Sequence, residues 1–128
     1  MIPEELKYTQ EHEWVKVEGN RATVGITDHA QSQLGDVVFV ELPQVGSEHH
    51  KGDSLASVES VKAVSDVYAP VSGKVVEVNA QLQDHAELVN QEPYGRGWIA
   101  VLEMSDPSEL DQLLSAADYG KVVQEAGE

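Results

Sequence analysis

The chain has 128 residues, which is the size of one domain, and its 23 acidic and 8 basic side chains give a formal net charge of −15. This charge opposes binding to nucleic acid and to anionic membranes, and it favours transient, salt-sensitive contacts with proteins that present basic patches. Cysteine is absent, which excludes disulfides, thiolate nucleophiles and thiolate metal sites. Any sulfur chemistry must therefore use sulfur from outside the chain.

The chain lacks the sequence features of membrane and secreted proteins. No stretch approaches the roughly 18 apolar residues of a membrane span. The first ten residues, MIPEELKYTQ, have neither a basic start nor an apolar signal core. We therefore expect a cytoplasmic protein of a bacterial cell, or a mitochondrial matrix protein only if a transit peptide has been removed.

The first third of the chain predicts a hairpin, a short helix and a strand. Residues 12–27 alternate apolar and polar side chains around a Glu-Gly-Asn turn, which is typical of a β-hairpin. Residues 28–35 (DHAQSQLG) predict a short helix that Asp28 caps and Gly35 ends in a left-handed conformation. The following run, DVVFVELP, is β-rich and ends at its proline.

The middle of the chain predicts more strands and one exposed turn. Residues 58–75 (VESVKAVSDVYAPVSGKV) suggest a strand, a tight reversal with Lys62 near its apex, and a second strand. The stretches GKVVEVNAQL and PYGRGWIAVLEM then complete the β-rich part. A faint Pro-x-x-Gly repeat, at 43–46 and 70–73, indicates two similar halves with Lys62 near their junction.

The C-terminal part of the chain predicts helices. Asp106 followed by Pro107 has the order that a helix start prefers. We expect an apolar stripe formed by Leu110, Leu113 and Leu114, and a further helical segment at about 117–124. Many short strands followed by helices favour a small antiparallel sandwich or barrel flanked by helices.

The sequence offers no convincing constellation for catalysis or for metal binding. Of the five histidines, only His49 and His50 are adjacent, and on a strand they would point to opposite faces. Metal-ligand spacing such as His-Glu-x-x-His is absent, so we expect surface histidines and no metal. The Gly-Arg-Gly at 95–97 lacks the third glycine of a dinucleotide-binding loop, and no nucleophile-elbow sequence occurs.

Lys62 remains the one residue that stands out. Lysine at an exposed turn is ordinary, but the Ser-Val-Lys-Ala-Val tip contains none of the residues that usually form turns, which indicates a tip selected for display. A free amine is a poor nucleophile unless its pKa is lowered. The neighbouring Glu59 and Asp66 would keep the amine charged, so a modification site is favoured over a catalytic lysine.

Several blocks of the sequence have the letters of one protein family. They are Glu59–Ala63 with Ser65-Asp66 and Ala69–Gly73, the N-terminal blocks His12–Val15, Val24–Gln31 and Leu34–Asp36, and the C-terminal blocks Leu88–Asn90, Pro93-Tyr94 and Gly97-Trp98. Together they resemble the glycine cleavage system H protein family over nearly the whole chain, and the letters around Lys62 resemble its lipoate-attachment segment. Biotin carriers typically set their lysine between methionines, and lipoyl domains of 2-oxoacid dehydrogenases usually have an acidic residue directly before it; this chain has neither.

The resemblance implies a fold and a cofactor. The implied fold is mainly β, a barrel-sandwich hybrid (lipoyl/biotinyl-carrier-like) of two small antiparallel sheets, with short helices that include a C-terminal one. Residues 1–128 would form a single lipoyl-carrier domain, with a lipoyl-like core at about 22–104 and a C-terminal helical segment at about 106–125. The implied cofactor is lipoate in amide linkage to Lys62, which supplies the sulfur that the chain lacks.

The resemblance also implies a function, that of a non-catalytic carrier of glycine catabolism and one-carbon metabolism. Such a carrier takes the aminomethyl group of glycine from a pyridoxal-phosphate glycine decarboxylase (P protein) to a tetrahydrofolate-dependent aminomethyltransferase (T protein). Dihydrolipoyl dehydrogenase (L protein) then reoxidises its swinging arm. A monomer is implied, and so is service by lipoate-attaching enzymes. The alternative is a lipoyl-relay or interaction protein of the same fold that does not serve glycine oxidation.

Four residues besides Lys62 receive roles through the resemblance. Glu13 and Asp66 are implied to line a surface cleft in which the loaded arm shelters, where their carboxylates would face its positive amine. Glu59 and Gly73 belong to the attachment motif that lipoate-attaching enzymes are expected to recognise.

Overall fold

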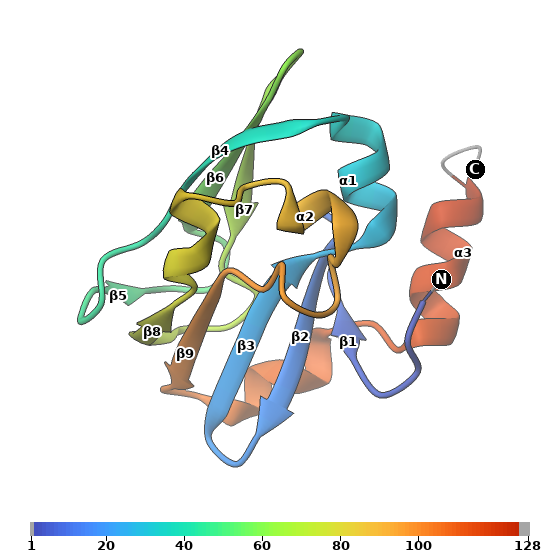
Figure 1. Ribbon diagram of the computed structural model, residues 1–128. Helices are drawn as coiled ribbons and strands as arrows, with labels where there is room; N and C mark the ends of the chain where they lie inside the picture. The colour runs from blue at the N-terminus through green and yellow to red at the C-terminus, as the bar shows by residue number, and fades with distance from the viewer. Residues whose placement is uncertain (1, 126–128) are drawn as a thin grey trace.

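A computed structural model describes residues 2–125, and it consists of two antiparallel sheets with short helices around them (Figure 1). The larger sheet has the strand order β1-β2-β3-β9-β8-β5 and the smaller one β4-β6-β7; within residues 2–125 they do not close into a barrel. The strands are β1 (Lys7–Tyr8), β2 (Glu13–Glu18), β3 (Arg21–Ile26), β4 (Val37–Glu41), β5 (Glu48–His49), β6 (Ser54–Ser60), β7 (Val64–Tyr68), β8 (Gly73–Val78) and β9 (Ala100–Met104).

The helices are short, as expected for a mainly β domain. They comprise three α-helices, α1 (Asp28–Leu34), α2 (Leu88–Gln91) and α3 (Ala116–Glu125), and two 3₁₀ segments, η1 (Ala80–Gln83) and η2 (Pro107–Gln112). The mainly β class with a C-terminal helix is therefore confirmed. No helix within residues 2–125 combines the length and apolar character that a membrane crossing needs.

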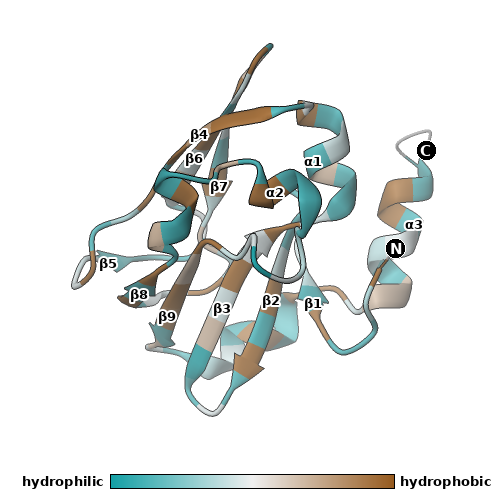
Figure 2. Ribbon diagram, viewed as in Figure 1, coloured by the Kyte–Doolittle hydropathy of each residue, from teal (hydrophilic) through white to brown (hydrophobic). Residues whose placement is uncertain are grey.

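One apolar core lies between the sheets because their strands alternate inward apolar and outward polar side chains. Val24 of β3, Val58 of β6, Val75 of β8 and Leu102 of β9 are all fully buried in this core. Each buried side chain of this size stabilises the fold by roughly 1.5–3 kcal/mol relative to an exposed one. Figure 2 shows that β4 and β9 are mostly hydrophobic, and within β4 the residues buried in the core are Val37 and Val40.

A second apolar cluster attaches the C-terminal helix α3 to the start of the chain. Tyr119 of α3 stacks on Tyr8 of β1, with ring centroids 4.7 Å apart, and both side chains are fully buried. Leu6 and Trp14 belong to the same cluster. The C-terminal helix is thus part of the folded domain, and it packs against β1.

The predicted helix start at 28 is confirmed, but its predicted cap is wrong. The side chain that accepts the Ala30 amide is that of Thr27, and Asp28 is the first helical residue. Asp28 instead accepts a hydrogen bond from the Gln31 side chain at 2.9 Å. The end of the helix agrees with the prediction, because Gly35 has a φ of 80° and its N–H bonds to the Gln31 carbonyl.

The predicted leucine stripe does not lie on one helix. Asp106 and Pro107 do begin a helical segment, η2, but it is a 3₁₀ helix. At Leu113 the chain becomes extended, and Leu114 exchanges two backbone hydrogen bonds with Tyr8, at 2.9 and 2.7 Å. Leu110 and Leu113 therefore pack on the main core, whereas Leu114 packs on the second cluster.

The segment 58–75 also divides differently from the prediction. Strands β6 and β7 form the expected hairpin, but residues 69–72 then carry the chain to the other sheet, where β8 begins. Glu109 of η2 holds this crossing, because its carboxylate accepts the N–H of Ser72 at 2.6 Å and its hydroxyl at 2.9 Å. The hairpin that carries Lys62 is therefore short and belongs wholly to the three-stranded sheet.

Candidate functional site

Lys62 lies exposed at the tip of the β6–β7 hairpin, which projects beyond the rest of the molecule (Figure 1). The turn is closed by a hydrogen bond from the Ser60 N–H to the Ala63 carbonyl at 2.8 Å. The Ser60 hydroxyl oxygen also accepts the N–H groups of Ala63, at 3.1 Å, and of Lys62, at 3.3 Å. A serine side chain therefore supplies the support that a turn-forming residue would otherwise give, and the two central positions stay free to carry Val61 and Lys62.

The tip rests on the junction between α1 and β4. The Val61 N–H donates to the Asp36 carbonyl at 3.1 Å. The Asn90 side chain holds this junction in place by accepting the Val37 N–H and donating to the Gly35 carbonyl, both at 2.8 Å. A Cβ at Gly35 would lie 3.5 Å from Lys62 Cε, so the lysine stem passes close to this glycine. The backbone at the tip of the hairpin is thus held in place by hydrogen bonds to the junction between α1 and β4.

A cleft of about 470 Å³ opens beside the hairpin, between β7, α1 and the start of β2. Glu13 and Asp66 both line it, so the structure brings together the two carboxylates that were predicted to share a cleft. Ala63 and Val64, next to Lys62, line the same cleft. Its walls combine apolar and polar side chains, among them Ile26, Leu34, Val58, Val67, His12, His29 and Ser65.

Glu13 is a buried carboxylate rather than a solvated one. Its side chain is 2% exposed, accepting the Thr9 hydroxyl at 2.6 Å on one oxygen and the Tyr68 N–H at 3.1 Å on the other. Burial raises the pKa of Glu13 to about 7, although these two hydrogen bonds favour its ionised form. Asp66, by contrast, is exposed, and it accepts the Ser54 hydroxyl at 3.2 Å.

The bond from Tyr68 to Glu13 also identifies the open edge of the hairpin. β7 is the last strand of its sheet. Because Ala63 is bonded back to Ser60, the alternation of an antiparallel pair directs the N–H groups of Val64, Asp66 and Tyr68 away from β6. The Tyr68 group meets Glu13. Hydrogen-bonding groups of Val64 and Asp66 thus face the cleft side of β7.

His12 lies in the cleft wall and is half-buried, which corrects the prediction of a surface histidine. It has a φ of 74°, in the left-handed region, and its Nδ1 lies 2.7 Å from the Tyr119 hydroxyl. That hydroxyl lies 2.7 Å from the hydroxyl of Thr27, which accepts the Ala30 amide. The Tyr119 hydroxyl thus lies within hydrogen-bonding distance of both the Thr27 hydroxyl and His12 Nδ1.

The environment of His12 favours the neutral form of its imidazole. Burial lowers the pKa of His12, and the ring of His29, whose centroid is 4.5 Å away, lowers it further. The hydrogen bond between His12 Nδ1 and the Tyr119 hydroxyl fixes the orientation of the ring. One wall of the cleft therefore depends on the C-terminal helix, because Tyr119 of α3 orients His12.

Glu59 and Gly73, the two residues expected to belong to an attachment motif, lie in different environments. Glu59 is exposed on β6, paired in register with Val64 of β7 and close to the tip. Gly73 is buried on β8 in the other sheet, and a Cβ there would meet the Glu103 carbonyl oxygen at 2.3 Å. Close approach of two backbones accounts for the glycine, whereas Glu59 lies where a partner protein can reach it.

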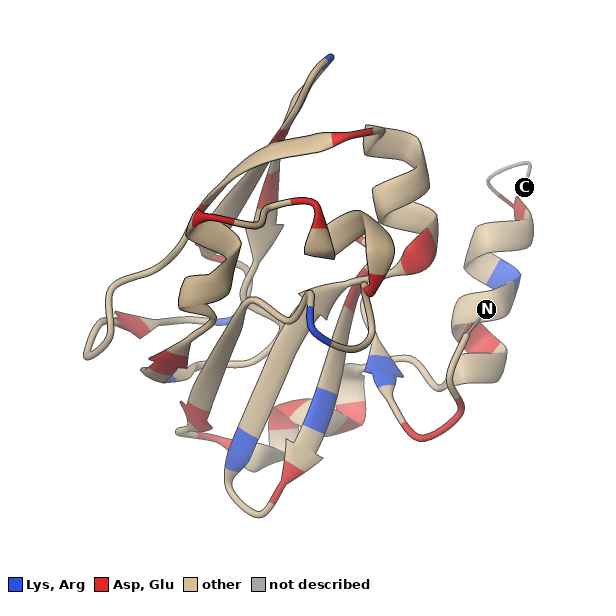
Figure 3. Ribbon diagram, viewed as in Figure 1, with Lys and Arg blue, Asp and Glu red and all other residues tan. Residues whose placement is uncertain are grey.

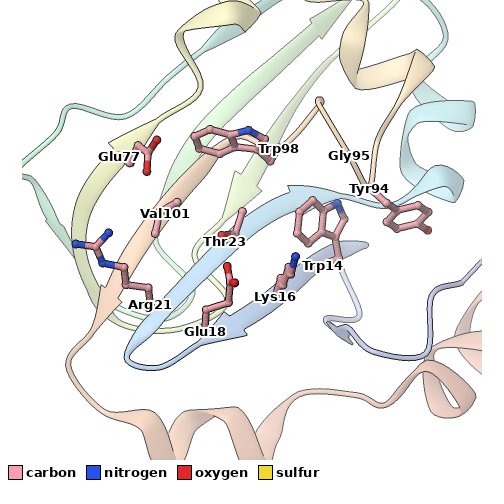
Figure 4. Close-up of a pocket in the computed structure, with 10 residues that line it drawn as sticks. All are labelled: Trp14, Lys16, Glu18, Arg21, Thr23, Glu77, Tyr94, Gly95, Trp98 and Val101. Carbon is pink, nitrogen blue, oxygen red and sulfur yellow. The ribbon is translucent and has the colours of Figure 1, made fainter.

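A second hollow, of about 380 Å³, lies on the outward face of the six-stranded sheet (Figure 4). Its lining includes Trp14, Trp98, Lys16 and Arg21, and none of the predicted site residues. The Trp14 indole lies against Gly25, where a Cβ would be 2.5 Å from the ring, and its Nε1–H donates to the Pro93 carbonyl at 2.8 Å. Since Glu13 and Trp14 alternate along β2, the two hollows lie on opposite faces of that strand.

The arrangement at the hairpin suits a carrier of a covalently attached group. The tip offers one exposed amine, and the cleft beside it offers two carboxylates of different character and a partly apolar wall. Residues 2–125 contain no group of three or more histidine or acidic side chains placed to hold a metal ion. The geometry therefore favours display of an attached arm with a nearby shelter for its end.

Sequence reasoning missed three residues that build the site: Ser60, Asn90 and His12. The absence of turn-forming residues at the tip was itself a signal that a neighbouring serine supports the turn. Asn90 and His12 gave no comparable local signal, because their partners are remote in the chain: Asn90 bonds to Val37, and His12 to Tyr119.

Comparisons with known proteins agree with this arrangement. The family model described as glycine cleavage H-protein matches residues 6–126. A glycine cleavage system H protein of Carboxydothermus hydrogenoformans is 58% identical over 128 residues, covering 100% of this chain and 98% of that protein. One from Staphylococcus haemolyticus is 59% identical over 124 residues, covering 97% and 98%. The crystal structure of a glycine cleavage system H protein from Mycobacterium marinum matches with a TM-score of 0.87 and 38% identity, covering 99% of this chain and 100% of that one.

Proposed function

Because the chain belongs to the glycine cleavage H-protein family, we propose that it is the lipoylated carrier protein of the glycine cleavage system. It shuttles the aminomethyl group of glycine from the pyridoxal-phosphate glycine decarboxylase to the tetrahydrofolate-dependent aminomethyltransferase. Dihydrolipoyl dehydrogenase then reoxidises it. The chain itself changes no bond of glycine; it is a carrier component that visits three enzymes in turn, in the cytoplasm.

The observation that carries this proposal is the display of Lys62 on a turn that Ser60 supports. An amide linkage to lipoate needs an amine that an attaching enzyme can reach, on a backbone that stays in place, and the Asp36–Val61 bond supplies the second condition. When attached, lipoate supplies a dithiolane that accepts the aminomethyl group and stores an electron pair. The residues present fit this group, because the exposed Lys62 stands beside a cleft with apolar walls.

The cleft gives the chain a second task, the protection of what the arm carries. Asp66 places an exposed carboxylate on the cleft wall, where a positively charged amine finds a charge-assisted partner, and the carboxyl group of Glu13 lies buried beneath the same cleft. Val58, Ile26 and Leu34 supply apolar surface that limits access of water. The arm is therefore held between visits to the partner enzymes.

The partner enzymes are met through brief, polar contacts. A net charge of −15 favours partners with basic patches, and contacts of this kind form quickly and dissociate quickly. Rapid dissociation is what a carrier needs if it is to serve three enzymes and a lipoate-attaching enzyme in sequence. Tethering the intermediate keeps its effective concentration high without release. A monomer is best suited to binding these enzymes one after another.

Glycine–bicarbonate exchange, reconstituted with cognate glycine decarboxylase and the lipoylated chain, tests the proposal. We expect exchange with the wild-type chain and none with Lys62→Arg, because arginine keeps the charge but cannot form the lipoyl amide. Thermal unfolding of Lys62→Arg should be nearly unchanged, since an exposed tip contributes little packing.

Two results would contradict the proposal in different ways. Retained exchange with Lys62→Arg would move the anchor to another of the six lysines. A chain that is lipoylated at Lys62 but supports no exchange would instead favour a lipoyl-relay or interaction protein that does not serve glycine oxidation.

A further inference from the structure

Exposed apolar side chains gather around the hairpin tip. Within residues 2–125, seven large hydrophobic side chains are exposed, and five of them lie on the three-stranded sheet or its Lys62 turn. Four of these, which we call the tip patch, are Val38 (54% exposed), Phe39 (50%), Val61 (71%) and Val64 (67%). Apolar surface concentrated in this way marks an interaction site more often than it occurs by chance.

A β-bulge in β4 places Phe39 in this patch. Strict alternation from the buried Val37 would turn Phe39 inward and Val40 outward. The register between β4 and β6 shifts between Val37 and Phe39, so that Val38 and Phe39 both point outward and Val40 returns to the core. The only phenylalanine of the chain is thereby kept on the surface.

Acidic side chains lie within and around the tip patch. Across the three strands, Phe39, Glu59 and Val64 lie in one row, and Glu41, Ser57 and Asp66 lie in the next. No lysine or arginine occurs in β4, β6 or β7, so Lys62 is the one cation of this sheet and its turn (Figure 3). A hollow of about 570 Å³ borders the patch and is lined by Glu41, Val64 and Asp66. Because Glu59 lies between Phe39 and Val64, and Glu41 and Asp66 lie in the next row, the patch combines apolar side chains with carboxylates. Such a surface fits an apolar recess that also carries lysine and arginine.

The enzyme that attaches lipoate needs a surface feature that distinguishes Lys62 from the other lysines. The chain has six lysines with identical side chains, and an enzyme that modifies only one must recognise the surface around it. The tip patch is continuous with Lys62 and extends beyond the attachment motif, because Phe39 comes from β4, more than twenty residues earlier in the chain.

We propose that the tip patch is the docking surface for the lipoate-attaching enzyme, and that Phe39 and Val64 determine the choice of Lys62. This inference rests on the proposed function, since it needs Lys62 to be the anchor. The occupant is a protein whose active-site entrance is an apolar recess that also carries lysine and arginine. Docking there brings Lys62 Nζ to the bound acyl donor.

The chemical step that docking serves is amide formation. Lys62 loses a proton to solvent, and its Nζ attacks the carbonyl carbon of a lipoyl adenylate. The C–N bond forms as the bond from that carbon to the phosphate oxygen breaks, and AMP leaves with the electron pair. The nitrogen then loses a second proton, so the product is a neutral amide and the chain has lost one positive charge.

Attachment kinetics on the bare, full-length chain test the inference. The probe is a purified lipoate–protein ligase with lipoate and ATP, and the readouts are the mass of the intact chain over time and peptide mapping of the modified lysine. We expect Phe39→Ser and Val64→Ser each to raise KM for the chain about tenfold, with kcat little changed. Val45→Ser is the matched control, because Val45 is 61% exposed but lies outside the patch, and its KM should equal that of the wild-type chain.

A charge reversal tests the contribution of the acidic side chains separately from that of the apolar ones. Glu41→Lys should raise KM and flatten its dependence on salt, whereas Glu77→Lys, with the same change in charge on the other sheet, should do neither. Modification of the wild-type chain at Lys62 together with unchanged KM in Phe39→Ser, Val64→Ser and Glu41→Lys would overturn the inference alone. No modification of Lys62 in the wild-type chain would overturn the proposed function and the inference with it.

Discussion

Replacing Glu13 by glutamine isolates the energetic effect of a carboxylate buried under the cleft. Glutamine keeps the size of the side chain and can still accept the Tyr68 N–H through its amide oxygen. Its amide group can donate to the Thr9 oxygen, which now donates to Glu13 at 2.6 Å. The variant therefore preserves most of the local contacts and removes the ionisation.

The size of the effect follows from the pKa of Glu13. The pKa is about 7 in the folded chain and 4.5 in the unfolded one, so between these values the folded state holds a proton that the unfolded state has lost. Stability therefore falls as pH rises through this window. At 1.36 kcal/mol per pKa unit the full cost approaches about 3 kcal/mol above pH 7, and the part between pH 5.5 and 7 is about 2 kcal/mol.

Urea denaturation of both proteins at pH 5.5, 6.5 and 7.5 measures this cost while staying above the isoelectric point of about 4.5. The free energy of unfolding of the wild-type chain, minus that of Glu13→Gln, should fall by about 2 kcal/mol across the series. His12, whose pKa is lowered by burial, is present in both proteins, so its contribution cancels in the difference. A difference that stays constant, or rises with pH, would refute the reasoning and indicate that hydrogen bonds from Thr9 and Tyr68 outweigh burial.

Two further predictions concern the cleft and the crossing between the sheets. In the lipoylated and loaded chain, Glu13→Ala and Asp66→Ala should each speed the spontaneous release of ammonia and formaldehyde, measured without partner enzymes; unchanged rates in both would mean that the arm is sheltered elsewhere. Gly73→Ala should destabilise the fold by roughly 2 kcal/mol or more, because its methyl group would collide with the Glu103 carbonyl, and a melting temperature equal to that of the wild-type chain would contradict this.

Local signals were sufficient for the longer strands and for the placement of Lys62 at an exposed turn. The hairpin at 12–27 follows from alternation and a turn rich in glycine and asparagine, and it appears as β2 and β3. Lys62 was singled out because its turn lacks turn-forming residues. Thr27 and Asp28 show where local signals stop, because both residue types cap helices well and only the backbone geometry distinguishes them.

Features that depend on contacts between remote residues could not be predicted. The helical pattern of the three leucines gave way because Leu114 pairs with Tyr8 of β1. The bulge at Val38 leaves no mark on an apolar run in which every residue can face the core. The burial of Glu13 depends on Tyr68, 55 residues later, so a carboxylate in an ordinary strand sequence gave no sign of it.

The hydrogen bond between Glu13 and Tyr68 also affects how readily two molecules of this chain associate through their edge strands. An edge strand with free N–H and C=O groups can pair with the edge of a second molecule, which is a common start of aggregation. On β7 the carboxylate of Glu13 occupies the Tyr68 N–H, so an incoming strand finds bonding positions only at Val64 and Asp66. Two positions beside an acidic side chain, on molecules that each carry a charge of −15, give too little attraction for such pairing. Association of chains through the β7 edge should therefore be weak even in crowded solutions, because Glu13 occupies part of this edge.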